Sequence, residues 1–304
     1  MKRIFSSTVM ILTLQVINVA MAQQSGTGTS APPRTFKAGS HIVRTIDLPT
    51  NVKLEYVEQG DANGVPVIFL HGITDSWHSF ESVLSYLPKN IHAFAISQRG
   101  HGDSEQPSSD YQPKDFANDV AAFIKKKNLG SAIVVGHSMG GMVAQQFAVL
   151  HPKLLKGLVI IDSDAYFKEN PGMPEFYQEV LKLTGSIDKK FMDDFQAATL
   201  AKPIDSAYFK LLVAEGMKCP VRVFQAALKG LIETDLSADI KKITAPTLIF
   251  WGDKDGFCLR NGQDKMANAI KGSKLIIYEG TGHALHWEEP QRFVGDLTQF
   301  IKSL

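Results

Sequence analysis

Residues 134–143 read V-V-G-H-S-M-G-G-M-V. A β-branched apolar run leads to Ser138, which has a glycine two positions before it and another two positions after it, and a second apolar run follows. The pattern G-x-S-x-G between a buried strand and a helix is typical of a nucleophilic serine on a strained strand-to-helix turn. The alternative is a small serine in a Gly-rich joint. The two interpretations differ in whether the rest of the chain offers a general base and a carboxylate that could activate Ser138.

Around this stretch, short apolar runs alternate with segments of helical spacing. Uncharged apolar runs separated by helices indicate parallel strands covered on both faces. The dipeptide Asn63-Gly64 is the strongest short signal for a hairpin turn. The predicted strands are residues 41–48, 53–59, 65–72, 91–97, 132–136, 155–162, 245–252 and 274–278, and the predicted helices are residues 79–87, 114–128, 139–150, 261–270 and 290–304.

Residues 165–240 interrupt this alternation. They are helix-prone, rich in Phe, Lys and Ala, divided by prolines, and contain no buried strand run. We therefore expect a helical insertion between two strands of the sheet.

The first 22 residues have a different composition from the rest. A short positive start and a mostly apolar run end at Ala20 and Ala22, the small residues of a secretory cleavage site. The pattern predicts a signal peptide over residues 1–22 and export to the periplasm or the medium. An uncleaved anchor is the alternative, but the run is shorter than the ~20 residues of a membrane span. Residues 23–40 are polar and Pro-containing and are predicted to be disordered, so the fold should begin near His41.

The chain has 304 residues, 44% hydrophobic and 21% charged, with a formal net charge of +1. This composition fits one large domain or a core with a subdomain. The lysines at 125–127 are interpreted as the solvated end of a helix, so no nucleic-acid partner is expected. Cys219 and Cys258 match no zinc spacing, so no metal is expected. Whether they form a disulfide is left open.

A serine hydroxyl needs a general base to act as a nucleophile. His283 lies in E-G-T-G-H-A, a Gly-rich loop after a predicted strand and before the last helix. His286 is the competitor, although it lies nearer the helix. His137 adjoins the serine, but neighbouring side chains in a sharp turn point in different directions, so we interpret it as a satisfied turn residue.

The base in turn needs a carboxylate to orient it. Asp255 follows a predicted strand in F-W-G-D-K-D-G, with Asp253 two positions earlier as its main rival. Asp162, at the end of another strand, is the second rival. The preferred order Ser138, Asp255, His283 differs from the orders of the serine proteases.

The tetrahedral intermediate needs two hydrogen-bond donors, and losing one typically costs about 3 kcal/mol of transition-state stabilisation. The backbone amide of Met139, directly after the serine, is one candidate. The amide of Ile73, in the loop after an early strand, is the other. Trp77 and His78 follow this loop and are candidates for contacting the substrate.

Five segments in order resemble the landmarks of the α/β-hydrolase superfamily: H-G-I-T-D-S-W, S-Q-R-G-H-G-D-S, G-H-S-M-G-G, W-G-D-K-D and G-T-G-H-A-L-H-W-E-E-P. The resemblance implies an α/β-hydrolase fold, with an eight-stranded, mostly parallel sheet and helices on both faces. The core would comprise residues 41–164 and 241–304, and residues 165–240 would form a helical cap. The superfamily often has Asp two positions before the Arg of its R-G-x-G turn, where this chain has Ser97.

Within this superfamily, dehalogenases and epoxide hydrolases use an Asp nucleophile, which disfavours both here. Met139 stands where proline iminopeptidases usually have Trp. We therefore expect a cofactor-free serine hydrolase that cleaves an ester or lactone of a small to medium apolar molecule. The alternatives are a cofactor-free perhydrolase, a carbon–carbon bond hydrolase that needs basic groups such as Arg222 or Arg260, and a non-enzymatic binding module. An apolar pocket would be built in part from Phe167, Phe176, Tyr177, Phe195, Tyr208, Phe209 and Phe224.

Overall fold

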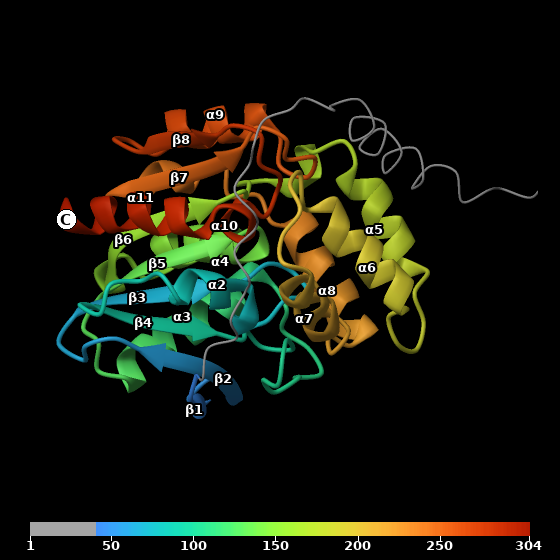
Figure 1. Cartoon of the computed structure of the whole chain (residues 1–304), viewed down its shortest axis with the longest axis horizontal. Helices are drawn as coiled ribbons and strands as arrows, with labels where there is room; N and C mark the ends of the chain where they lie inside the picture. The colour runs from blue at the N-terminus through green and yellow to red at the C-terminus, as the bar shows by residue number, and fades with distance from the viewer. Residues whose placement is uncertain (1–40) are drawn as a thin grey trace, which may run out of the picture. The chain divides into compact units, whose positions relative to one another are not determined.

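The computed structural model describes residues 41–304, and within them eight strands form one sheet in the order β1-β2-β4-β3-β5-β6-β7-β8 (Figure 1). Strand β2 runs antiparallel to both of its neighbours, and β3 to β8 pair in parallel. The predicted eight-stranded, mostly parallel sheet is confirmed. The strands are β1 Val43–Leu48, β2 Val52–Gln59, β3 Val65–Leu70, β4 Ile91–Ile96, β5 Ala132–His137, β6 Leu155–Ile161, β7 Thr247–Gly252 and β8 Lys274–Tyr278.

Helices cover both faces of the sheet because its strands are apolar on both sides. Successive side chains of a strand point to opposite faces. Ile68 packs in the cluster that contains α3, α4 and α9, whereas Phe69 packs in the cluster that contains α2 and α11. The helices outside the insertion are η1 Trp77–Phe80, α2 Glu81–Leu84, α3 Pro113–Lys126, α4 Met139–Leu150, η2 Pro152–Leu154, η4 Ile240–Lys242, α9 Arg260–Ala269, α10 Leu285–Glu288 and α11 Pro290–Lys302.

Residues 165–240 hold helices and no strand (Figure 1, yellow-green to orange). Asp188 and Asp205 cap two of these helices by accepting hydrogen bonds from backbone amides of the first turn. Tyr208 anchors the insertion to the core, because its hydroxyl donates to the carbonyl oxygen of His78 at 2.8 Å. The elements are η3 Phe167–Glu169, α5 Met173–Leu181, α6 Lys189–Ala198, α7 Ser206–Gly216 and α8 Val221–Glu233.

Two local predictions were wrong. The turn at Asn63 and Gly64 is present, with the Gly64 amide bonded to the carbonyl of Asp61 at 2.8 Å. However, it joins β2 to β3, which are not neighbours, because the fully buried β4 lies between them. The helix predicted over residues 79–87 ends three residues earlier and begins as a 3₁₀ turn, because η1 and α2 together span Trp77–Leu84.

Ser97 and Glu55 together take the place of the Asp that the superfamily often has at position 97. The Ser97 hydroxyl donates to Glu55 Oε2 at 2.7 Å, and the Asp103 amide donates to the same oxygen at 3.3 Å. Ser97 Oγ also accepts a hydrogen bond from the Trp77 amide at 3.1 Å. Glu55, on β2, therefore supplies the negative charge beneath the R-G-H-G turn.

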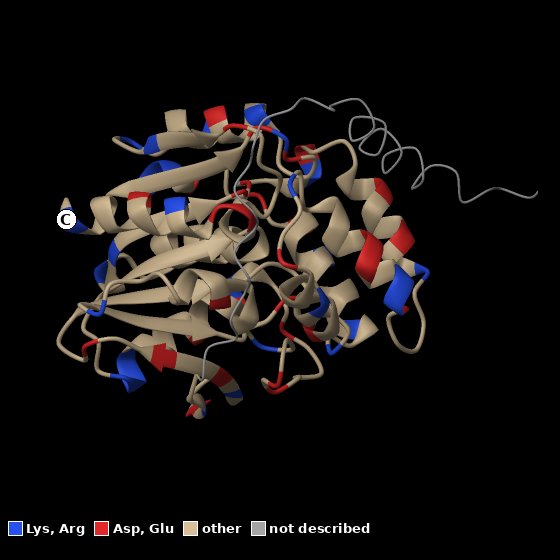
Figure 2. Cartoon of the chain, viewed as in Figure 1, with Lys and Arg blue, Asp and Glu red and all other residues tan. Residues whose placement is uncertain are grey.

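The central strands β3, β4, β5 and β7 contain no Lys, Arg, Asp or Glu, while both signs of charge are mixed over the outer elements (Figure 2). Within residues 41–304, no helix is both long and apolar enough to span a membrane. The predicted signal peptide, residues 1–22, and the predicted disordered segment, residues 23–40, lie outside the residues that the structure describes.

Candidate active site

Ser138 occupies a strained backbone conformation between β5 and α4, with φ 51° and ψ −116°. Such a conformation costs a non-glycine residue about 1–3 kcal/mol and persists only where the surroundings enforce it. Here the Ser138 amide donates to the carbonyl of Ile161 at 3.0 Å, and the Ser163 hydroxyl donates to the carbonyl of Ser138 at 2.7 Å. The turn is therefore fixed from β6, the neighbouring strand.

The glycines on either side of the serine allow this close packing. A Cβ atom at Gly136 would lie 2.0 Å from the carbonyl oxygen of Gly140. A Cβ atom at Gly140 would lie 2.2 Å from the carbonyl oxygen of Leu70, at the end of β3. Since both obstacles are backbone atoms, no side chain fits, and this is the physical reason for the G-x-S-x-G pattern.

His283 and Asp255 lie together in two loops at the carboxyl ends of β8 and β7. His283 Nδ1 is 2.9 Å from Asp255 Oδ2, and both side chains are buried. The other carboxylate oxygen of Asp255 accepts from the amides of Phe257 at 2.7 Å and Cys258 at 3.0 Å. This arrangement places the Nδ1 proton on the aspartate side and leaves Nε2 of His283 available as a proton acceptor.

Asp253 and Asp162, the two alternatives to Asp255, form their hydrogen bonds with other partners than His283. Asp253 accepts from the Gly280 amide at 2.5 Å and from Lys254 at 3.1 Å. Asp162 accepts from the Gly252 amide at 2.8 Å, and burial, together with the charge of Asp255, raises the pKa of Asp162 well above its usual range. Of the three candidates, Asp255 is the one that contacts the histidine.

The neighbouring histidines support the loop of residues 279–284, which carries the candidate base His283 and is called the base loop below. His137 Nε2 donates to the carbonyl of His283 at 2.9 Å, while its Nδ1 is buried and has no partner within residues 41–304. His286 packs against Phe80 and lies 3.3 Å from the Ser79 hydroxyl. Burial lowers the pKa of His137 well below its usual range and that of His286 to about 3, so both rings stay neutral.

The backbone amides of Ile73 and Met139 are the two expected donors to an oxyanion. Within residues 41–304, neither the Ile73 amide nor the Met139 amide donates a hydrogen bond. The loop that carries Ile73 is joined to the serine turn, because the Gly140 amide donates to the carbonyl of His71 at 3.1 Å. His71 is fixed in turn, since its Nε2 accepts from the Gln98 amide at 2.9 Å and its Nδ1 lies 2.7 Å from the carbonyl of Gly72.

Part of the helical insertion packs on the base loop. The Ala284 amide donates to the carbonyl of Thr199 at 3.0 Å. Glu288 accepts from the amides of Ala201 at 2.8 Å and Gly282 at 3.0 Å. The segment after α6 is therefore linked to Ala284 directly and to Gly282 through Glu288, a contact that no sequence pattern indicated.

A row of aromatic rings in contact leads from His283 into the helical insertion. The Phe257 ring lies 5.0 Å from the His283 ring and 6.0 Å from that of Phe195, which stacks on Phe176 at 5.5 Å. The surroundings of His283 on this side are therefore apolar.

Trp77 and His78, the two residues expected to contact substrate, lie in η1 and stack on each other at 3.7 Å. Trp77 meets His41 edge to face, and His78 Nδ1 lies 2.5 Å from Glu81 Oε2. These contacts, together with the hydrogen bond from Tyr208 of α7 to the carbonyl of His78, hold η1 in place and do not involve Ser138.

Asp255, His283 and Cys258 bring three potential metal-ligating atoms within 4.8 Å of one another. Metals bind the thiolate form of cysteine. Burial and the nearby carboxylates raise the pKa of the Cys258 thiol well above its usual range, which disfavours this form. Cys219 and Cys258 are both free and buried, so the structure contains no disulfide between them.

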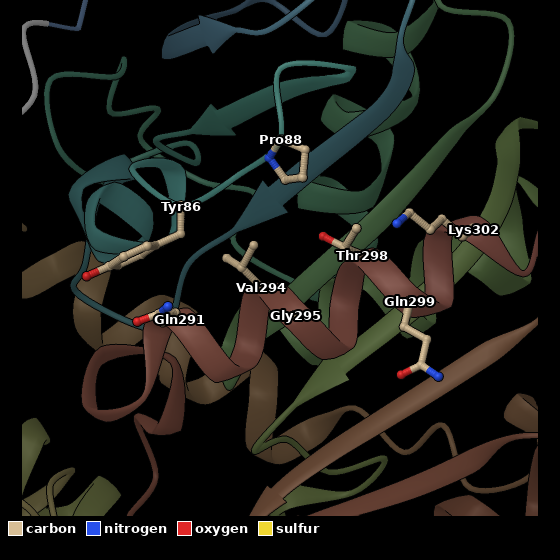
Figure 3. A pocket seen from close by; sticks show the side chains of 8 residues that line it. All are labelled: Tyr86, Pro88, Gln291, Val294, Gly295, Thr298, Gln299 and Lys302. Carbon is tan, nitrogen blue, oxygen red and sulfur yellow. The ribbon is translucent and has the colours of Figure 1, made fainter.

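A separate surface groove of about 490 Å³ lies along α11 and contains none of these residues (Figure 3). It is lined by Tyr86, Pro88, Gln291, Val294, Gly295, Thr298, Gln299 and Lys302. It lacks a nucleophile paired with a base, so the candidate active site remains the one around Ser138.

The fold and this constellation define a class of hydrolases, and comparison with known proteins agrees. Residues 65–290 match the family model described as the alpha/beta hydrolase fold. The chain therefore belongs to the α/β-hydrolase fold family.

Its relatives carry out different reactions. The chain is 27% identical to a non-heme chloroperoxidase of Streptomyces lividans, over 85% of this chain and 99% of that protein. It is 26% identical to the monoacylglycerol lipase abhd6-A of Xenopus laevis, over 84% of this chain and 80% of that protein. An esterase from Exiguobacterium antarcticum superposes with a TM-score of 0.78 at 22% identity, over 86% of this chain and all of that one, which shows the shared fold alone.

Proposed function

We propose that this protein is a serine hydrolase that cleaves an ester or lactone of a small to medium apolar molecule through an acyl-enzyme. The observation that carries the proposal is the 2.9 Å contact of His283 with Asp255, in loops that flank the strained turn of Ser138. Similarity to a lipase also supports ester cleavage.

In the proposed reaction, the Ser138 hydroxyl attacks the carbonyl carbon of the substrate while Nε2 of His283 takes its proton. The carbonyl oxygen becomes an oxyanion, which accepts hydrogen bonds from the amides of Ile73 and Met139. Asp255 stabilises the protonated imidazole. His283 then returns the proton to the leaving alcohol, and the C–O bond breaks to give the acyl-enzyme. Water, deprotonated by His283, attacks this ester and releases the acid and Ser138.

The apolar preference rests on the rings that surround the base. Phe257 adjoins His283, and Phe195 and Phe176 continue the apolar surface into the insertion. Charged acyl groups would lose their hydration there without gaining a partner.

The proposal is tested with Ser138→Ala and a p-nitrophenyl short-chain ester. We expect turnover and labelling by a fluorophosphonate probe to be lost, because no other group replaces the serine oxygen, while thermal unfolding changes little. The control is Ser109→Ala, which alters an exposed serine and should leave kcat/KM unchanged. Turnover that persists in Ser138→Ala would rule out Ser138 as the nucleophile.

A perhydrolase is the second candidate, favoured by the 27% identity to a chloroperoxidase. It would use the same residues, with hydrogen peroxide in place of water as the attacker of the acyl-enzyme. Halogenation of monochlorodimedone by peroxide and halide that requires added acetate would identify this activity.

The carbon–carbon hydrolase alternative has less support. Arg222 donates to the carbonyls of Gln106 and Pro107, and Arg260 pairs with Asp264 at 2.8 Å. Both basic groups are thus engaged on exposed parts of the structure. We also propose export of the protein, on the sequence of residues 1–22 alone.

A further inference from the structure

Asp75 is a buried carboxylate directly after the turn that carries Ile73. Its Oδ1 accepts from Gln196 Nε2 at 2.9 Å, and its Oδ2 accepts from the Ser79 hydroxyl at 3.3 Å. Asp75 Oδ2 also packs against Gly72, where an added Cβ would lie 3.1 Å from this oxygen, and the Asp75 amide donates to the carbonyl of Gly72 at 3.3 Å. Asp75 is thus packed against the turn that it follows.

Gln196 belongs to α6, in the helical insertion, and is 1% exposed. One turn earlier, Met192 Sδ lies 3.9 Å from the hydroxyl of Thr74, which has a positive φ of 67°. The loop of residues 71–75 is therefore held on one side by the core, through His71, and on the other side by α6.

A buried carboxylate is unfavourable unless its environment satisfies it. Burial raises the pKa of Asp75 to about 6, an effect that the hydrogen bonds of Gln196 and Ser79 oppose, so the group is mostly ionised at neutral pH. The titratable groups that face it are His283 from the base loop, Tyr208 from α7, Cys219 after α7 and, through Ser79, His286 of α10. A neutral or apolar residue would avoid this penalty, which points to a role for the carboxylate.

We propose that Asp75 is a positioning residue that couples the docking of α6 to the geometry of the Gly72–Ile73 turn, so that the Ile73 amide reaches the oxyanion only when Gln196 is in place. This inference rests on the proposed function, because it gives the Ile73 amide a purpose. It makes the insertion part of the catalytic geometry as well as a cover for the substrate.

The test uses Asp75→Ala, Gln196→Ala, their double variant and Asp75→Asn in the full chain. We expect kcat for a p-nitrophenyl ester to fall about 10- to 100-fold in both alanine variants, because a displaced donor stabilises the oxyanion poorly. KM should stay within about threefold, since the donor acts mainly in the transition state. Inhibition by a trifluoromethyl ketone, which forms a similar oxyanion, should weaken in the same proportion as kcat/KM.

The kcat of the double variant should be no lower than that of the less active single variant, because both substitutions break the same hydrogen bond between Asp75 and Gln196. Asp75→Asn should keep kcat within about tenfold, since its amide oxygen can still accept from Gln196 Nε2 and the two side chains have the same shape. The matched control is Gln225→Ala, which removes another amide of the insertion that binds only the end of α5 and the segment after it. It should leave kcat unchanged.

Unchanged kcat in Gln196→Ala, additive losses in the double variant, or an equal loss in Gln225→Ala would each overturn the coupling. If Asp75→Ala does not fold, Gln196→Ala decides the test, because it keeps the carboxylate of Asp75. Hydrogen–deuterium exchange provides a readout without turnover: residues 71–75 should exchange faster in Gln196→Ala than in Gln225→Ala. If the wild-type protein cleaves no ester, the proposed function fails, and exchange alone then decides the inference.

Discussion

At the scale of single residues, the turn at Ser138 depends on the absence of a side chain at Gly140. Gly140 lies where the turn passes the end of β3, and its own amide donates to the carbonyl of His71, in the loop of residues 71–75. A methyl group there would push apart the turn and the loop. The two halves of the candidate site are therefore packed against each other through a glycine.

We expect Gly140→Ala to lower the free energy of unfolding by about 2–3 kcal/mol, because the added Cβ would lie 2.2 Å from the Leu70 carbonyl oxygen and the backbone must shift. Gly295→Ala on α11 is the control. No atom lies within 4 Å of its added Cβ, so it should stabilise the protein by about 0.5–1 kcal/mol. Urea denaturation measures both, and an equal effect of the two substitutions would show that the close approach is absent.

The residues that could be predicted from the sequence are those with a local signature. Ser138 lies between glycines, and Asp255 and His283 each follow an apolar strand. Asp75 and Gln196 have no such signature, since they are 121 residues apart in the chain and meet only because the insertion folds back over the sheet. His137 was interpreted as a turn residue, and its bond to the carbonyl of His283 could not be predicted for the same reason.

At the scale of elements, the short helix α10 holds the base loop and the insertion together. Glu288 accepts from amides on both sides, and burial raises its pKa to about 7. Its second carboxylate oxygen is buried and has no partner within residues 41–304. In the unfolded chain this group loses its proton at a lower pH, so the folded state holds one more proton between about pH 4.5 and 7.

Stability should therefore fall as pH rises through this window and level off above the folded pKa. We expect Glu288→Gln, which keeps an oxygen for the two amides, to gain about 2–3 kcal/mol relative to wild type between pH 4.5 and pH 8. Urea denaturation at both pH values measures the free energy of unfolding of each protein. Subtracting the wild-type value from that of the variant removes the contribution of the other titrating groups. A difference independent of pH would mean that Glu288 titrates normally.

Element boundaries followed the sequence where local signals are strong. Helix α4 spans Met139–Leu150, the predicted range, because the serine turn sets its start and His151-Pro152 its end. The order of strands was not open to such analysis. The Asn63-Gly64 turn has the residues of a hairpin, yet β4 pairs between β2 and β3, since its six buried residues need neighbours on both sides.

At the scale of the whole molecule, the two cysteines are protected by burial. Cys219 and Cys258 are free, and burial raises the pKa of Cys219 to about 12. Neither thiol presents the thiolate that oxidants attack. Such protection would matter in the oxidising compartment that we propose for the mature protein.

We expect the native protein to show no thiol that reacts with Ellman's reagent at pH 8, because both sulfur atoms are buried. After unfolding in guanidinium chloride without reductant, both thiols should react. Unfolded protein that still shows none would instead indicate a Cys219–Cys258 disulfide.

The pairing of Ser97 with Glu55 has a consequence for how this family is compared across species. The negative charge beneath the R-G-H-G turn comes from β2 here, and in chains with Asp at position 97 it would come from the segment after β4. Positions 55 and 97, 42 residues apart, can thus each supply the carboxylate for this turn. In an alignment of relatives, these two positions should covary, so that chains with an acidic residue at one of them vary at the other.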